Sequence, residues 1–231
     1  MITKAVYIKS FLIFALLGGA LACPAGAAVI VHSTTIDPQA VGWSETVNLP
    51  QFDPNLGALQ AVTLRIIGNI SGDVGVENLE DKFSSVAGNL AGSLEVFDQG
   101  NQLLLTLNLL QTGQQVVDPF DNKLDYGGTS GYTFGSLIAS GNTSAYYIPP
   151  GHDLSPFVGV GTIQFYINAT DTSFGSSSGG NFAFWSALMG GATLEISYTT
   201  GLIPEPTTMA HLVVAAGICY ALRRRHALVR R

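Results

Sequence analysis

The chain has 231 residues, of which 47% are hydrophobic and only 11% are charged, and its formal net charge is −6. Ten basic residues are too few for a protein that binds nucleic acid through its phosphates. The two cysteines, Cys23 and Cys219, lie toward opposite ends, so the body of about 175 residues between the terminal segments has no disulfide and no thiolate metal site. Its hydrophobic core alone must hold that body together.

The first 27 residues have the pattern of a secretory signal peptide. Lys4 and Lys9 form a basic start, and Phe11 to Ala22 is an apolar run of 12 residues. This run has the length of a signal-peptide core and is too short for an ordinary membrane-spanning helix. Small residues accepted by signal peptidase follow, including Ala25, Ala27 and Ala28. The predicted cleavage lies after Ala27 or after Ala28. Acylation of Cys23, as in a lipoprotein, is a less favoured alternative because Leu21 fits that signal poorly.

Residues 28–202 are predicted to form one exported all-β domain. Apolar and polar residues alternate over 62–66, 103–109, 163–167 and 194–199, the period of strands with one buried face. About nine or ten short strands predict an antiparallel β-sandwich, flanked by the signal-peptide helix and a C-terminal hydrophobic helix. The remaining strands are expected at 28–33, 43–49, 73–78, 89–98, 143–148 and 181–188.

Turn residues divide these strands. Asp98–Asn101 and Gly68–Asp73 have the composition of tight hairpin turns. The pair 127–128 and the Ser/Gly stretch 175–180 are predicted to be flexible, exposed loops. Residues 79–88 are expected to form one helical turn at most.

Residues 203–231 have three parts in order. Pro204, Glu205 and Pro206 form a rigid break, residues 207–222 are mostly apolar, and a basic cluster follows. The apolar run would span about 24 Å as a helix, which is marginal for a bilayer. The basic cluster begins with Arg223, Arg224 and Arg225.

Charge is divided by segment. All sixteen acids lie between Asp37 and Glu205, together with only three basic residues, so that stretch carries −13. Arginines beside an apolar helix stay on the cytoplasmic side of a membrane, which predicts that the body is held outside. Anionic lipid headgroups would repel such an acidic body.

The tail resembles the PEP-CTERM sorting signal of Gram-negative bacteria, through its Pro-Glu-Pro triplet, apolar run and arginines 223–225. The resemblance implies recognition by exosortase, an inner-membrane protease, cleavage near the triplet, and release or transfer to the cell surface or exopolysaccharide matrix. Residues 30–200 resemble the choice-of-anchor E family of exported β-rich domains, through 47–57, 62–66, 124–131 and 159–163. This second resemblance implies no reaction.

No catalytic constellation is apparent in the body. Its two histidines are His32 and His152, and the neighbouring Asp153 would point away from His152 in an extended chain. The chain is therefore predicted not to be an enzyme, and a surface-loop histidine is the preferred interpretation of His152.

Two kinds of ligand site stay open. Glycan binding would use exposed aromatic rings, but Trp185 is interpreted as a core residue, and only one of Tyr146 and Tyr147 can be exposed on a strand. The other aromatic candidates are Trp43, Tyr126 and Tyr132. Calcium is a weak candidate cofactor, because several oxygen ligands gather in one loop, although a solvated acidic loop is the preferred interpretation. These ligands are Asp118, Asp121, Asn122 and Asp125.

The sequence thus predicts an exported surface or matrix protein with a structural or adhesive role in exopolysaccharide or biofilm. Signal peptidase and exosortase would be its processing enzymes, and the C-terminal helix would hold it in the inner membrane before processing. Extracellular polysaccharide is a candidate partner, and nucleic acid is excluded. The alternative is a glycan- or calcium-binding module without catalysis.

Overall fold

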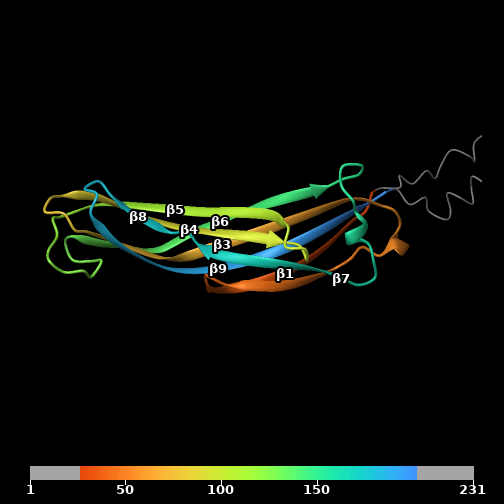
Figure 1. Cartoon of the computed structure of the whole chain (residues 1–231), viewed down its shortest axis with the longest axis horizontal. Helices are drawn as coiled ribbons and strands as arrows, with labels where there is room; N and C mark the ends of the chain where they lie inside the picture. Colours follow the sequence, from red (N-terminus) through yellow and green to blue (C-terminus); the bar gives the residue numbers. More distant parts are fainter. Residues whose placement is uncertain (1–26, 202–231) are drawn as a thin grey trace, which may run out of the picture. The chain divides into compact units, whose positions relative to one another are not determined.

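Two antiparallel sheets make up residues 27–201, the part of the chain that the computed structural model describes (Figure 1). The first, sheet 1, has the order β1 (Val29–Ala40), β9 (Phe182–Thr200), β3 (Leu59–Asn78) and β6 (Gly131–Tyr147). The second, sheet 2, has the order β2 (Ser44–Pro50), β7 (Thr162–Asp171), β4 (Ser84–Phe97) and β5 (Leu103–Val117), and β8 (Phe174–Ser177) also pairs with β4. The predicted all-β antiparallel architecture is confirmed.

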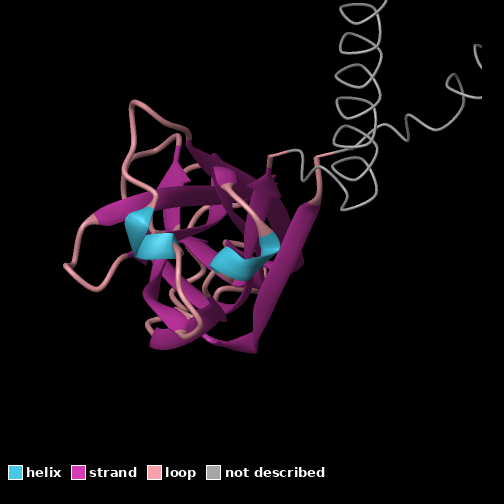
Figure 2. Cartoon of the chain, turned by 90° about the vertical axis from the view of Figure 1, so that its right-hand side faces the viewer, coloured by secondary structure: helices cyan, strands magenta, loops and turns pink. Residues whose placement is uncertain are grey.

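Helical structure in residues 27–201 is confined to two 3-10 turns, η1 (Pro54–Leu56) and η2 (Ser155–Phe157), at the end of the domain that faces the viewer in Figure 2. No helix in this range is long and apolar enough to cross a membrane. The predicted signal-peptide helix and C-terminal helix lie outside the described residues.

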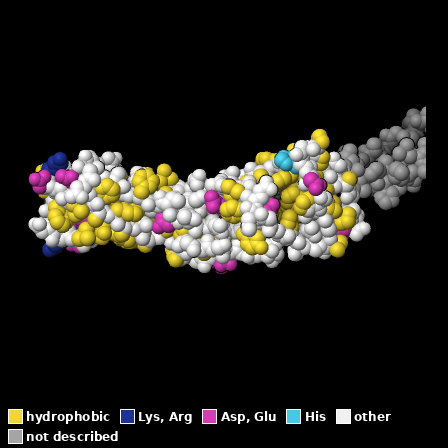
Figure 3. All heavy atoms as spheres, viewed as in Figure 1, with side chains coloured by type: hydrophobic (Ala, Val, Ile, Leu, Met, Phe, Trp, Pro, Cys, Tyr) yellow, Lys and Arg dark blue, Asp and Glu magenta, His cyan; other side chains and the backbone are white. Residues whose placement is uncertain are grey.

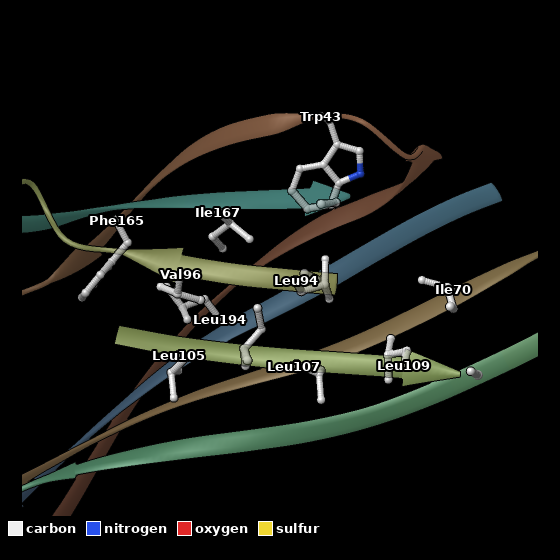
Figure 4. Close-up of a cluster of buried hydrophobic side chains, with 14 of the residues drawn as sticks. Trp43, Ile70, Leu94, Val96, Leu105, Leu107, Leu109, Phe165, Ile167 and Leu194 are labelled. Atoms are coloured by element: carbon white, nitrogen blue, oxygen red, sulfur yellow. The ribbon is translucent and has the colours of Figure 1, made fainter. Parts of the chain in front are cut away.

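Large apolar side chains fill the space between the sheets near Ala28 and Thr200, which are joined by a backbone hydrogen bond of 2.9 Å. Leu194, Ile196 and Tyr198 of β9 are completely buried, as are Phe165 and Ile167 of β7. Figure 4 shows this packing, with β4, β5 and β7 contributing from sheet 2. We call this end, built around residues 59–66 of β3, the proximal half. The alternation predicted for 62–66, 163–167 and 194–199 is confirmed there.

The distal half, built around residues 70–78 of β3, packs differently. Phe134 of β6 enters between Gly88 of β4 and Gly113 of β5, which are register partners in sheet 2. A methyl group on Gly88 would lie 2.4 Å from Cδ2 of Phe134, and one on Gly113 would lie 2.3 Å from Cδ1. The glycines therefore make the slot that admits the ring.

Two local predictions are wrong. Gly68–Asp73 is no hairpin but the middle of the 20-residue strand β3, which joins the two strands predicted at 62–66 and 73–78. Irregularity there is limited to a register shift between Gly72 and Val74. The predicted loop 175–180 begins inside β8. Residues 79–88, expected to form at most one helical turn, form none, and β4 begins at Ser84. Long partner strands on both sides supply the backbone hydrogen bonds that keep the glycine-containing segment extended.

The predicted turn at Asp98–Asn101 is confirmed and closes the β4–β5 hairpin. The amide of Asp98 donates to the carbonyl of Gln102, and that of Asn101 donates to the carbonyl of Asp98. The Asp98 carboxylate accepts the amides of Gly100 and Gln102, each at 2.8 Å. A left-handed backbone at Asn101, with φ of 58°, completes the reversal, and asparagine tolerates this conformation well.

Candidate functional site

The residues of the predicted sorting signal lie outside the described part of the chain. These are Pro204, Glu205, Pro206, Arg223, Arg224 and Arg225, and Ala25 of the predicted cleavage region also falls outside. Ala27 and Ala28 are exposed, and β1 begins one residue later at Val29. The compact unit that contains both sheets runs from Ala28 to Gly201.

The acidic loop, residues 118–130, joins β5 to β6 at the distal end. The carboxylate of Asp121 accepts the amide of Lys123 at 2.9 Å, and that of Asp125 accepts the amide of Gly127 at 3.0 Å. Both carboxylates face Gly128. If this glycine carried a Cβ atom, that atom would lie 2.9 Å from Oδ2 of Asp121 and 3.8 Å from Oδ1 of Asp125. Asp118 is joined to its surroundings through its backbone, which bonds Thr129 and the Asn78 side chain.

The structure thus brings two of the three calcium candidates to one glycine. Within residues 27–201 no three His, Cys, Asp or Glu side chains are grouped closely enough to hold a metal ion. Calcium binding by Asp118, Asp121 and Asp125 stays a prediction.

A buried carboxylate anchors the acidic loop to sheet 1, and the sequence analysis did not identify it. Glu77 of β3 is completely buried and accepts hydrogen bonds from the Tyr126 amide at 2.7 Å and from the Ser130 hydroxyl. The neighbouring Asn78, also completely buried, donates to the carbonyls of Lys82 and Asp118. Buried charge and amide groups need such partners, so these two residues fix the position of the loop.

The aromatic candidates separate into core and surface residues. Trp43 is a core residue whose Nε1 donates to the Gly190 carbonyl at 3.2 Å. Trp185 is not part of the core, contrary to the preferred interpretation, because β9 turns its even-numbered residues inward and Trp185 outward. Its indole lies over Gly75 and makes an edge contact with the Tyr126 ring at 6.0 Å between centroids.

The two tyrosines of β6 behave as predicted. Tyr146 is 64% exposed on the outer face of sheet 1, whereas Tyr147 is half-buried against Phe157 of η2 and the His152 ring. Burial, with a smaller effect from Asp98, raises the pKa of Tyr147. Tyr132 is 42% exposed and tilts against Phe134.

Neither body histidine is bonded to an acid or a serine within the described residues. His32 of β1 makes an edge contact with Tyr198, at 6.1 Å between centroids, and His152 makes one with Tyr147. Asp153 instead accepts the amide and hydroxyl of Ser155, and these hydrogen bonds lower the pKa of Asp153. As predicted, Asp153 does not form a pair with His152.

Two surface hollows were not predicted from the sequence. A groove of about 590 Å³ lies between residues 34–39 of β1 and 45–48 of β2, where Gln39 donates to Glu45 at 3.4 Å. A smaller pocket of about 340 Å³ lies on the outer face of sheet 2 and is lined by two aromatic residues. It is lined by Ser44, Phe97, Asn101, Tyr166 and Asn168. The pairing of β4 with β7, which brings the rings together, could not be read from either strand alone.

Basic side chains are scarce on this surface. In the view of Figure 3 they appear only at one end of the domain, while hydrophobic atoms are scattered along its length. Arg65 lies on the outer face of sheet 1, where its Nε donates to Asn142 at 3.3 Å. The other two basic residues of the described range, Lys82 and Lys123, lie in the distal loops.

Comparison with known proteins identifies no family for this chain. No family model matches the sequence, and no curated protein matches it. Solved structures of infectious bursal disease virus are similar at a low level: the Gt strain at 9% identity over 77% of this chain, and a subviral particle at 13% over 76%, both with a TM-score of 0.20. The chain spans 38% of the length of each viral chain. Similarity this weak carries no functional argument.

Proposed function

We propose that this chain is an exported bacterial protein, processed by exosortase, that serves a structural or adhesive role at the cell surface or in the exopolysaccharide matrix. Signal peptidase would remove the first 27 or 28 residues. The tail 203–231 would hold the intermediate in the inner membrane of a Gram-negative bacterium until cleavage near Pro204, Glu205 and Pro206. The exported domain would act by binding rather than by catalysis.

The observation that carries this proposal is the distribution of charge and apolar sequence. Five of the ten basic residues follow the C-terminal apolar run, two precede the N-terminal one, and every acid lies between Asp37 and Glu205. Basic residues next to apolar segments set membrane orientation and are poorly translocated. The basic residues at both ends therefore favour cytoplasmic ends, with the body between them, of net charge −13, on the other side of the membrane.

Deletion of residues 203–231 tests the sorting step. We expect the truncated protein to be found in the periplasm or the medium. The product of the full-length gene should be found at the surface or in the matrix, and its mass should correspond to a chain that ends near the Pro-Glu-Pro triplet. The measurement is cell fractionation with intact-mass analysis of the product. The matched variant Glu205→Gln, with Arg223, Arg224 and Arg225 retained, separates recognition of the triplet from membrane retention.

Two results would contradict the proposal. One is unchanged localisation after the deletion. The other is a cytosolic product that still carries Met1 and Arg231.

A second candidate function is a glycan-binding or calcium-binding module. The outward-facing rings of Trp185, Phe97 and Tyr166 favour glycan binding, because exposed aromatic rings are the platforms on which sugars stack. The convergence of Asp121 and Asp125 on Gly128 favours the calcium version. Calcium at about 100 times its dissociation constant would stabilise the fold by about 2.7 kcal/mol. The control is a double variant with Asp121→Asn and Asp125→Asn. If millimolar calcium leaves the melting temperature of the wild type unchanged, as it should for the double variant, the calcium version is excluded.

A further inference from the structure

Two aromatic rings form the floor of the 340 Å³ pocket on sheet 2. Tyr166 of β7 and Phe97 of β4 are register partners, and both are half-buried on the outer face. Facing residues of neighbouring antiparallel strands have Cβ atoms about 4.5 to 5.5 Å apart, so the two side chains leave the sheet next to each other, and both line the pocket. The inward-facing neighbours Val96, Phe165 and Ile167 are completely buried and fix the strands beneath the floor.

Amides and a hydroxyl border this floor. Asn168 lies two residues beyond Tyr166 on the same face, and its Oδ1 accepts the Ser44 hydroxyl at 2.7 Å. The Nδ2 group of Asn168 has no hydrogen-bond partner among residues 27–201 and is free to donate. Asn101, exposed at the left-handed position of the β4–β5 turn, brings a second side-chain amide that is without a partner in the same range.

We propose that this pocket binds one neutral pyranose unit of an extracellular polysaccharide. The C–H face of the sugar ring would stack on Tyr166 and Phe97, while its hydroxyls bond the side-chain amides of Asn101 and Asn168. A volume of about 340 Å³ is near the lower limit for small-molecule sites, which suits one ring of a chain that passes across an open face. This inference rests on the proposed matrix function and assigns the residues that contact the polymer.

The charges around the pocket select a neutral sugar. No Lys or Arg lines it, and the three basic residues of the described range lie on the other sheet or in the distal loops. Glu95 lies opposite Asn168 in the β4–β7 ladder, on the same outer face. A uronate, sulfate or phosphate would be repelled by this carboxylate and would find no cation to bind.

Titration of the full-length chain, purified in a detergent without a sugar headgroup, tests the proposal. The probes are neutral hexasaccharides of glucose, mannose and galactose, with an oligogalacturonate of equal length as the anionic control. We expect at least one neutral probe to bind, and its affinity to be independent of salt because no ion pair forms. Tyr166→Ala should weaken this binding about tenfold, which corresponds to about 1.4 kcal/mol.

Two further variants make the test decisive. Asn101→Gly keeps the left-handed turn and removes only the amide, so it should weaken binding several-fold without loss of stability. Tyr146→Ala removes an exposed tyrosine from the other sheet and should leave binding unchanged. If Tyr166→Ala unfolds, as a lowered melting temperature would show, Asn101→Gly decides alone.

Three results would overturn the proposal: no binding of any neutral probe, stronger binding of the oligogalacturonate, or equal affinity in the wild type and the Asn101→Gly variant. Export is measured by cell fractionation and this site by titration. Either can therefore fail while the other holds.

Discussion

The two halves of the sandwich solve the same packing problem in opposite ways. In the proximal half both sheets contribute large side chains, such as Leu64, Phe165 and Tyr198, which interdigitate and are completely buried. In the distal half one sheet contributes a large ring, Phe134, and the other contributes glycines 88 and 113. Close packing is reached in both cases, but around Phe134 it depends on two residues that have no side chain.

This difference predicts which substitutions each half tolerates. The proximal half is filled from both sides, so it is sensitive to the loss of volume and to the introduction of charge. The distal half is sensitive in addition to the gain of a single methyl group, because the slot around Phe134 has rigid walls of backbone. Each of the following experiments challenges one part of that contrast.

Phe134→Ala should have the largest effect. Gly88 and Gly113, which line the slot, have no side chains that could fill the space left by the ring, so we expect a loss of about 3 to 5 kcal/mol in the free energy of unfolding. Urea unfolding measures this loss. Phe174→Ala, a substitution of the same type at a ring that is 50% exposed, is the control and should cost far less. If the two substitutions reduced the free energy of unfolding equally, the sheets would have moved together and filled the space left by the Phe134 ring.

Alkaline pH should weaken the proximal half. Burial raises the pKa of Tyr198 to about 12 from a model-compound value of 10.0, and its hydroxyl donates to the Pro50 carbonyl at 2.8 Å. The unfolded chain releases this proton first, so stability is fully present below pH 10 and falls as pH rises toward 12. A shift of about 2 units corresponds to about 2 to 3 kcal/mol.

The measurement is urea unfolding at a series of pH values from pH 8 upward to the highest pH at which the protein is still folded without urea. Tyr198→Phe should be less stable at neutral pH by about 1 to 3 kcal/mol, because it leaves the Pro50 carbonyl without its donor. It should also show a smaller alkaline decline. An identical decline in both proteins would place its origin elsewhere.

Gly88→Ala tests the walls of the distal slot. The added methyl would lie 2.4 Å from the Phe134 ring and 2.9 Å from Cγ1 of Val74, so we expect overpacking to cost about 1 to 3 kcal/mol. Gly92→Ala, four residues later on the same strand, is the matched control. Its methyl would lie 3.3 Å from the nearest atom, on the Ile70 side chain, so Gly92→Ala should cost less than Gly88→Ala. If both variants have the stability of the wild type, the ring is not confined.

The same contrast explains how much of the fold could be predicted from the sequence. Alternation over 62–66, 163–167 and 194–199 is readable because the inward positions of these three segments carry large apolar residues. In the distal half the inward positions include Gly88, and glycine resembles a turn signal in the sequence. Residues 68–73 were therefore mistaken for a hairpin, although they continue β3.

The candidate site shows a second limit. The oxygen ligands of the acidic loop were visible because they are close in sequence. The pocket of Phe97 and Tyr166 joins residues about 70 positions apart, and only the β4–β7 register brings them together. Glu77 is likewise completely buried, beneath a loop that begins 41 residues later, and no local pattern in β3 indicates that contact.

Gly75→Ala should have the smallest effect, although its added methyl would lie only 1.8 Å from Nε1 of Trp185. This glycine faces outward, so the half-buried indole can swing into solvent, which the enclosed Phe134 ring cannot do. We expect the loss to be limited to the edge contact with Tyr126, about 0.5 to 1.5 kcal/mol. Trp43, the other tryptophan, is only 9% exposed, so a red shift in fluorescence would report on Trp185.

Trp185→Phe is the control, because it removes the reporting indole and should abolish the shift that Gly75→Ala produces. The effect of a glycine beneath an aromatic ring would then depend on the face of the sheet. On the inner face the ring is confined, as Phe134 is, and on the outer face the ring can move, as Trp185 can. Should Gly75→Ala cost as much as Gly88→Ala and leave the emission unchanged, the indole must be held as firmly as Phe134. In that case the outer face of sheet 1 near Tyr126 is packed, and Trp185 is unsuited to receive a ligand.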